Sequence, residues 1–255
     1  MRVDWRSQEL QVNGLKTQVL SAGHGEPLVF WHGGGTAGGW DFAAPWTEKF
    51  TVYLPLHPGF GGSADDAGMT GIQDYVMHYL DLLDQLQLQR FHLVGFSLGG
   101  WMAATFASQQ SQRVHRLVLV APAGLWVREH PITDIFRLKP EELPAALAQN
   151  LAALGPAPDP HDVNAIVEGY RELTTLARIG WQRMYDPKLS KYLHRIHVPT
   201  LLVWGEQDRI VPLAQGAAWA RLIPGAQLRT FTPSGHVVLH ERPEAVKAVQ
   251  EFLSA

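Results

Sequence analysis

The sequence predicts an α/β protein built on a mostly parallel sheet with helices on both faces. Short apolar runs alternate with stretches of helical periodicity along most of the chain, which is typical of strand–helix–strand units. The runs are nearly continuous in Val, Leu and Phe, as expected for strands that are buried on both faces. A length of 255 residues with 46% hydrophobic and 18% charged residues suits one sizeable core.

The first predicted element is an antiparallel hairpin. Gln8–Val12 and Lys16–Ser21 flank Asn13-Gly14, a dipeptide that favours a two-residue turn between strands. Five runs with the composition of buried strands follow: Leu28–Trp31, Thr51–Leu56, Phe91–Gly95, Leu117–Val120 and Thr200–Trp204. A late strand is predicted at Gln227–Thr232.

Helices are predicted between and after these strands. The stretch Gln73–Leu88 gathers five apolar side chains roughly on one helical face: Tyr75, Tyr79, Leu82, Leu83 and Leu86. A second helix, Leu98–Gln109, directly follows the strand that ends at Gly95. Pro243–Leu253, with proline early in its first turn, is expected to be the closing helix.

Residues 122–198 interrupt the alternation. This stretch contains many prolines and several helix-like patches, but no convincing strand. Because an unstructured loop of this length is uncommon in a compact domain, we expect a helical cap, or lid, inserted into the core domain. The core domain would then consist of residues 1–121 and 199–255. The alternative is a long decorated loop.

Composition narrows the possible partners. The net charge of -3 gives no reason to expect nucleic acid or an anionic membrane. The absence of cysteine excludes disulfides, thiolate metal sites and a cysteine nucleophile. Met1–Leu10 lacks the pattern of a secretory signal, and no window approaches the ~18 apolar residues of a membrane helix, so a cytoplasmic protein is expected. The sequence leaves the oligomeric state open.

A candidate nucleophile lies between a predicted strand and a predicted helix. The segment Gly95-Phe96-Ser97-Leu98-Gly99 has the form G-x-S-x-G. A sharp strand-to-helix turn with flanking glycines lifts a serine hydroxyl clear of the sheet and places a helix N-terminus beneath developing negative charge. We therefore expect Ser97 to be the nucleophile, whereas the alternative is a structural serine in a glycine-rich turn.

Candidates for the base and the acid follow later strands. His236 lies in a glycine-flanked loop after the last predicted strand, from which it can reach Ser97 and accept its proton. Asp208 lies in the loop after Thr200–Trp204 and would orient the histidine. Glu206 is the rival for the acid. The order Ser, Asp, His along the chain is the order that such folds use.

The segment His32-Gly33-Gly34-Gly35 is a candidate oxyanion loop. Successive glycines allow the backbone to approach a ligand closely with its N–H groups. We assign the backbone N–H groups of Gly34 and Leu98 as the two donors to an oxyanion, and we expect His32 to support the loop. A plain flexible turn is the alternative. The histidines show no H-E-x-x-H motif and no metal-ligand spacing, so we expect neither a metal nor an organic cofactor.

The sequence resembles the α/β-hydrolase superfamily along nearly its whole length. The resemblance lies in five segments: His32–Gly35, Pro58–Ser63, Gly95–Gly100, Gly205–Pro212 and Gly235-His236 with Glu241-Arg242-Pro243. It implies an eight-stranded, mostly parallel sheet with a cap in the insertion, and it supports the Ser97, Asp208 and His236 assignment. Dehalogenases and epoxide hydrolases of this superfamily use an aspartate nucleophile, and its perhydrolases usually have a different oxyanion loop. These branches are therefore disfavoured.

Two reactions fit the resemblance. A serine esterase that cleaves a small to medium carboxylic ester is preferred. The competitor is a carbon–carbon bond hydrolase of aromatic ring-fission products, whose oxyanion loop looks much like His32–Trp40. That group typically has Asn before the nucleophile and Trp after the catalytic histidine, whereas this chain has Phe96 and Val237, which are expected to face the substrate.

Aromatic side chains of the insertion are further candidates for an apolar acyl pocket. These residues are Trp126, Phe136, Trp181 and Tyr185. Packing of the insertion against the core would explain each of them equally well. A hypothesis of another class also stands, in which the chain is a non-catalytic ligand-binding scaffold of the same fold.

Overall fold

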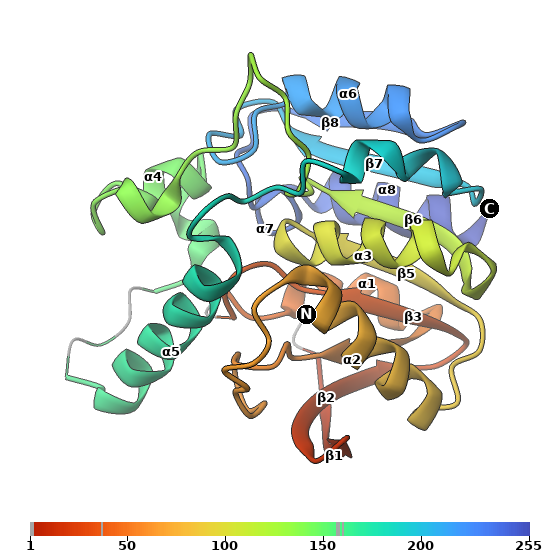
Figure 1. Cartoon of the computed structure of the whole chain (residues 1–255), viewed down its shortest axis with the longest axis horizontal. Helices are drawn as coiled ribbons and strands as arrows, with labels where there is room; N and C mark the ends of the chain where they lie inside the picture. Colours follow the sequence, from red (N-terminus) through yellow and green to blue (C-terminus); the bar gives the residue numbers. More distant parts are fainter. Residues whose placement is uncertain (1–2, 37, 157–158, 160) are drawn as a thin grey trace.

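The computed structural model describes residues 3–36, 38–156, 159 and 161–255. Its centre is one eight-stranded sheet with the strand order β1-β2-β4-β3-β5-β6-β7-β8 (Figure 1). Strand β2 pairs antiparallel with β1 and β4, and all other neighbours are parallel. The predicted fold class is therefore confirmed.

The strands lie close to their predicted positions. The hairpin consists of β1 (Arg6–Val12) and β2 (Leu15–Gly23), which turn at Asn13 and Gly14. The parallel strands are β3 (Glu26–Trp31), β4 (Phe50–Pro55), β5 (Phe91–Phe96), β6 (Val114–Val120), β7 (Thr200–Gly205) and β8 (Gln227–Phe231). Both faces of the central strands are buried, which is why their sequences are apolar at almost every position.

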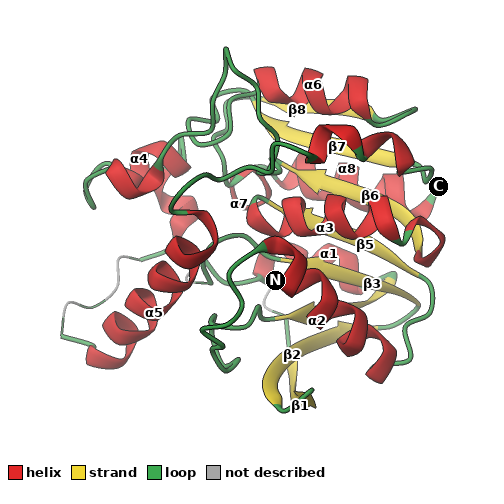
Figure 2. Cartoon of the chain, in the orientation of Figure 1, coloured by secondary structure: helices red, strands yellow, loops and turns green. Residues whose placement is uncertain are grey.

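Helices cover the two faces of the sheet and form two cores. Helices α2 (Ile72–Gln85), α3 (Leu98–Gln109) and α6 (Ala214–Leu222) pack on one face, and α1 (Ala44–Thr47) and α8 (Pro243–Ser254) pack on the other (Figure 2). Strand β3 shows the alternation directly. Val29 and Trp31 belong to the first core, and Leu28 and Phe30 to the second.

The boundaries differ from the prediction where a backbone turn ends an element. The helix predicted at Gln73–Leu88 ends at Gln85, because Gln87 has φ +57° and the Leu88 N–H donates to the Leu83 carbonyl at 2.9 Å. His240 lies in the short helix α7 (Val238–Glu241). In the part of the chain that the structure describes, no helix has the length and apolar character needed to cross a bilayer.

The insertion lies between β6 and β7, beyond the carboxyl ends of the strands (Figure 1). It contains α4 (Leu143–Leu147) and α5 (Val163–Gly180), and its described residues form no strand. Short 3₁₀ turns occur here and elsewhere, at Asp41–Ala43, Ser111–Arg113, Ile135–Arg137, Leu151–Leu154, Leu189–Lys191 and Leu193–Arg195. The division of the chain into a core domain and a helical cap stays a prediction.

Candidate active site

Ser97 lies in the sharp turn between β5 and α3. Its backbone has φ +52° and ψ -113°, a conformation that is strained for a residue with a side chain. Two hydrogen bonds hold this conformation: the Ser97 N–H donates to the Val120 carbonyl at 2.9 Å, and the Ala123 N–H donates to the Ser97 carbonyl at 3.0 Å. Strand β6 and the residues after it therefore fix the turn that presents the hydroxyl.

The flanking glycines are required by close packing. A Cβ atom on Gly95 would lie 2.5 Å from the Gly99 carbonyl oxygen, and one on Gly99 would lie 2.2 Å from the Trp31 carbonyl oxygen. Both contacts are with backbone atoms that cannot easily move. The G-x-S-x-G pattern thus reflects the approach of α3 to the ends of β3 and β5.

The three predicted catalytic side chains lie in one hydrogen-bonded chain. His236 Nε2 is 2.9 Å from Ser97 Oγ, and His236 Nδ1 is 2.8 Å from Asp208 Oδ2. A carboxylate beside Nδ1 favours the imidazole tautomer with its proton on that nitrogen. Nε2 is then free to accept the proton of the Ser97 hydroxyl.

The Asp208 carboxylate is held from both sides. Its side chain is 0% exposed, and its second oxygen, Oδ1, accepts the N–H groups of Ile210 at 2.8 Å and Val211 at 2.9 Å. The rival Glu206 points elsewhere, since it is exposed and accepts the Thr230 hydroxyl at 3.1 Å. Of the two acids, the structure brings Asp208 to the histidine.

Glu241 holds the loop that carries the histidine. Its carboxylate accepts the Ser234 hydroxyl at 2.9 Å and the Gly235 N–H at 2.5 Å. It also accepts the N–H groups of Gln149 and Asn150, each at 2.6 Å, from the insertion. One carboxylate therefore connects the histidine loop to the insertion.

Two buried histidines lie beneath the predicted oxyanion loop. The rings of His32 and His57 stack with centroids 3.6 Å apart. The His57 N–H donates to His32 Nε2 at 3.0 Å, and His32 Nδ1 lies 2.7 Å from the Gly33 carbonyl oxygen. Burial lowers the pKa of His32 to about 3, although the hydrogen bond to Gly33 opposes this shift. His32 is therefore a neutral support of the loop near pH 7.

The two predicted oxyanion donors belong to different segments of the chain. Leu98 is the first residue of α3, where N–H groups have no partner within the helix. Gly34 lies beneath α5, and a Cβ atom there would be 2.8 Å from Leu176 Cδ2. The Gly99 N–H donates to the His32 carbonyl at 3.0 Å, so the two segments are joined at their base.

A small hollow borders the turn at Ser97. It encloses about 30 Å³ and is lined by Phe30, Gly33, Gly35, Gly38, Gly39, Trp40, Phe42, Phe96, Val237, Leu239 and His240. A Cβ atom on Gly33 would lie 3.0 Å from the Phe96 ring and 3.4 Å from Ser97 Cβ, so one wall of the hollow is close to the Ser97 side chain, although Ser97 itself does not line it. Phe96 and Val237 both line this hollow, and their contact with a substrate stays a prediction.

The four aromatic candidates of the insertion do not line this hollow. Trp126 stacks on Tyr185 with ring centroids 4.5 Å apart, and Phe136 packs on Trp181 at 5.4 Å. Trp126 is 48% and Trp181 69% exposed. These side chains are thus paired with one another within the insertion.

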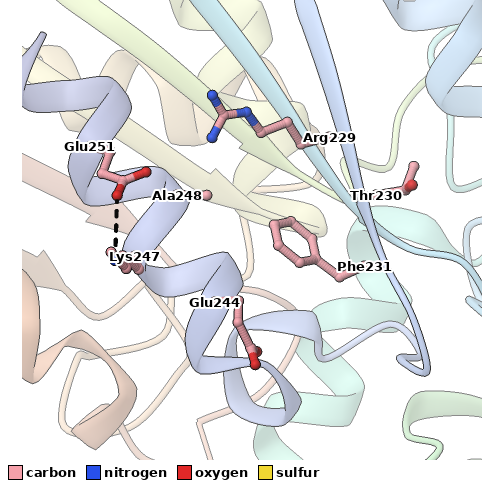
Figure 3. Close-up of a pocket in the computed structure, with 7 residues that line it drawn as sticks. All are labelled: Arg229, Thr230, Phe231, Glu244, Lys247, Ala248 and Glu251. Carbon is pink, nitrogen blue, oxygen red and sulfur yellow. Dashed lines mark ion pairs between the residues drawn. The ribbon is translucent and has the colours of Figure 1, made fainter.

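A larger hollow, of about 470 Å³, lies between β8 and α8 (Figure 3). Its lining residues are Arg229, Thr230, Phe231, Glu244, Lys247, Ala248 and Glu251. None of them belongs to the hydrogen-bonded chain at Ser97, and Lys247 pairs with Glu251 at 3.7 Å. Among the described residues of this open groove beside the edge strand, no histidine lies next to the Thr230 hydroxyl or the Lys247 amine as a base, so the candidate site is placed at Ser97.

Three side chains at the amino ends of the strands have metal-ligand chemistry. One potential ligand atom each from Glu26, His92 and His115 lies within 4.8 Å of the others. A zinc ion bound at about 2.1 Å would need these atoms roughly 3.5 Å apart. His92 Nε2 instead lies 3.0 Å from Glu26 Oε2, at the distance of a direct hydrogen bond. The group joins positions far apart in the sequence, which is why ligand spacing could not reveal it.

Sequence reasoning missed the two carboxylates that hold the site together. Glu241 belongs to a segment that carries the family resemblance, but no role was predicted for it. Glu172, on α5, accepts hydrogen bonds from Thr36 and Gly61, and no local pattern marks it.

Comparisons with known proteins give consistent results. A sequence model of the alpha/beta hydrolase family matches residues 28–249. The chain is 28% identical to the 2-hydroxy-6-oxo-2,4-heptadienoate hydrolase of Pseudomonas putida, over 95% of this chain and 94% of that protein. It is also 28% identical to a carboxylesterase of Bacillus subtilis, over 93% of this chain and 84% of that protein. Among solved structures, it matches a serine hydrolase involved in carbazole degradation, with a TM-score of 0.79 and 26% identity over 98% of this chain and 99% of that one.

Proposed function

This chain belongs to the alpha/beta hydrolase family, and from that premise we propose that it is a serine hydrolase that cleaves carboxylic esters with small to medium apolar acyl groups. The observation that carries the proposal is the hydrogen-bonded chain from Asp208 through His236 to Ser97. Hydrolysis itself is the reaction class of the relatives, which include esterases and carbon–carbon bond hydrolases.

The proposed reaction has two halves. In the first, Ser97 Oγ attacks the ester carbonyl carbon while His236 Nε2 takes the hydroxyl proton. The negative oxygen of the tetrahedral intermediate is stabilised by the Leu98 and Gly34 N–H groups. The carbon–oxygen bond to the alcohol then breaks, and the alcohol leaves with the proton from His236.

In the second half, water attacks the acyl-enzyme. His236 accepts a proton from the water molecule, and the bond between the acyl carbon and Ser97 Oγ breaks. The proton returns to Ser97 as the carboxylic acid leaves. Asp208 stays ionised throughout and stabilises the imidazolium form of His236. No step requires a metal or an organic cofactor.

The hollow beside Ser97 favours an ester over an anionic ring-fission product. Its described side chains are aromatic or aliphatic apart from His240. Burial lowers the pKa of His240, although hydrogen bonding to Gly39 opposes the shift, so this imidazole is neutral near pH 7. A substrate carboxylate would therefore meet no cation among the described lining residues. An apolar acyl group gains free energy there by leaving water.

The size of the hollow supports a short acyl chain. A water molecule needs roughly 10–15 Å³ of such space, and about 30 Å³ is present. This volume suits a methyl or ethyl group without rearrangement.

Carbon–carbon bond hydrolysis is kept as the second candidate because the Pseudomonas putida relative aligns over nearly the whole chain.

The test is hydrolysis of p-nitrophenyl esters from acetate to laurate, with Ser97→Ala as the control. We expect the highest kcat/KM with the shortest acyl chains and loss of essentially all turnover in Ser97→Ala. Labelling of wild type by a fluorophosphonate, absent in the variant, would identify the nucleophile directly.

Other outcomes distinguish the alternatives. Absence of ester turnover together with hydrolysis of 2-hydroxy-6-oxo-2,4-heptadienoate would replace the ester proposal by carbon–carbon bond cleavage. Absence of both activities and of labelling would favour a non-catalytic binding scaffold.

A further inference from the structure

Helix α5 meets the oxyanion loop through a buried carboxylate. Glu172 lies in the middle of α5 and is 7% exposed. It accepts the Thr36 N–H at 3.1 Å, the Thr36 hydroxyl at 2.5 Å and the Gly61 N–H at 3.1 Å. Thr36 follows Gly34 by two positions, so the helix is bonded to the loop that carries a proposed oxyanion donor.

The hydrogen bonds from Thr36 and Gly61 stabilise the buried carboxylate of Glu172. The nearby arginines have other partners: Arg171 pairs with Glu168 at 3.6 Å and donates to the Gly61 carbonyl, and Arg178 pairs with Asp65 at 2.5 Å. Burying a carboxylate is costly unless hydrogen bonds compensate for the lost water. An apolar residue would fill the same space, but it would leave the loop donors without an acceptor.

Neighbouring residues of α5 contact the loops that follow β3 and β4. Leu176, one turn after Glu172, covers Gly34, and Thr175 packs against Gly59, where an added Cβ atom would lie 2.5 Å from the Thr175 hydroxyl. Positions three and four residues apart lie on one helical face. The face of α5 formed by Glu172, Thr175 and Leu176 therefore lies directly on the loops after β3 and β4.

We propose that Glu172 is a positioning residue that holds the oxyanion loop, and that α5 restrains the movement of this loop. The inference rests on the proposed function, in which the Gly34 N–H stabilises the oxyanion. Such a donor is effective when it is held at about 2.7–3.1 Å from the position of the developing charge. Releasing Thr36 would allow the loop to move and would weaken this contact in the transition state more than in the bound substrate.

The first test compares Glu172→Gln with Glu168→Gln. The Glu172→Gln substitution keeps the size of the side chain, but the new amide N–H₂ group would face at least one of the three donors. Glu168 lies one turn earlier on the same helix, and its side chain is 48% exposed, so it is a matched control. We expect Glu172→Gln to lower kcat by about tenfold or more with little change in KM. Glu168→Gln should behave as wild type.

Thr36→Val and Thr36→Ser supply a second, milder pair. Thr36→Val removes one donor and keeps the shape, whereas Thr36→Ser keeps the hydroxyl. We expect kcat to fall in the first and to be largely retained in the second. In the Glu172→Gln background, Thr36→Val should lower kcat little further, because the two changes break the same contact.

Amide hydrogen exchange gives a readout that does not depend on turnover. The exchange of the Thr36 and Gly61 N–H groups should speed up in Glu172→Gln. In Glu168→Gln the exchange of the Thr36 N–H should stay unchanged, because the partner of Glu168, Arg171, donates to Gly61 and not to Thr36. Unchanged exchange, or faster exchange with an unchanged kcat, would overturn the proposal. If wild type hydrolyses no ester, the proposed function fails, while exchange still decides whether Glu172 holds the loop.

Discussion

Replacing Asp208 by Asn tests how the acid controls the imidazole. In wild type, Oδ1 accepts two backbone N–H groups, at 2.8 Å and 2.9 Å, and Oδ2 faces His236 Nδ1 at 2.8 Å. In Asp208→Asn, the amide oxygen must take the place of Oδ1, so the amide N–H₂ faces the imidazole. Nδ1 then has to accept a hydrogen bond, which moves the imidazole proton to Nε2. In this tautomer, His236 cannot accept the proton of Ser97.

The opposite amide orientation is disfavoured by the same two bonds. It would leave the N–H groups of Ile210 and Val211 buried without an acceptor, at a cost of about 1–3 kcal/mol each. Since about 1.4 kcal/mol is a factor of ten, this orientation is rare. We therefore expect kcat to fall by about 10⁴, as for the wrong tautomer in a serine triad.

The assay measures kcat and KM for p-nitrophenyl acetate in Asp208→Asn and in Glu206→Gln. Glu206 is the rival acid, and its side chain lies at the surface, so its replacement should leave kcat close to that of wild type. Circular dichroism would check that both variants are folded. If Asp208→Asn keeps more than about a hundredth of the wild-type kcat, the tautomer argument is wrong. A comparable loss in Glu206→Gln would transfer the role to that residue.

Three further predictions concern packing, pH and the hollow. Gly99→Ala should lower the free energy of unfolding in urea by about 1–3 kcal/mol, because the new Cβ atom would meet backbone oxygens. Gly169→Ala is the control: it has open space around it in helix α5 and should raise the free energy of unfolding by about 1 kcal/mol, because alanine favours the helix. Equal effects of the two substitutions would contradict the packing argument. Burial lowers the pKa of His32 to about 3 and that of His78 to about 4 in the folded chain. As the pH falls below about 6.5, these two histidines are therefore protonated in the unfolded chain before they are protonated in the folded chain. The stability they contribute is complete above that pH, and on acidification it decreases by up to about 1.4 kcal/mol per pH unit for each group. The free energy of unfolding in urea, measured at pH 7.5 and pH 5, should therefore decrease less in His78→Gln than in wild type. An identical decrease would show that His78 does not contribute. Leu239→Ala should enlarge the hollow and move the ester preference to longer acyl chains, and an unchanged chain-length profile would place the acyl group elsewhere.

Local sequence patterns determined the order of the elements and the positions of the candidate reactive residues. Apolar periodicity and turn chemistry are read over a few neighbouring residues, so the strands and the glycine turn at Ser97 could be predicted directly. Asp208 and His236 could be chosen because the carboxyl ends of parallel strands meet at one edge of a sheet. The structure has the predicted strand pattern and brings the three side chains within hydrogen-bond distance of one another.

Tertiary structure alone decided what holds and surrounds these residues. Glu172 and Thr36 are 136 positions apart, and Glu241 and Gln149 are 92 apart. Such contacts follow from the way the insertion folds back on the core, and no local periodicity encodes them. For the same reason, sequence reasoning could not tell that Trp126 and Tyr185 pair with each other, whereas Phe96 and Val237 line the hollow. A turn can be read from neighbouring residues, but packing between distant segments depends on the three-dimensional path of the whole chain.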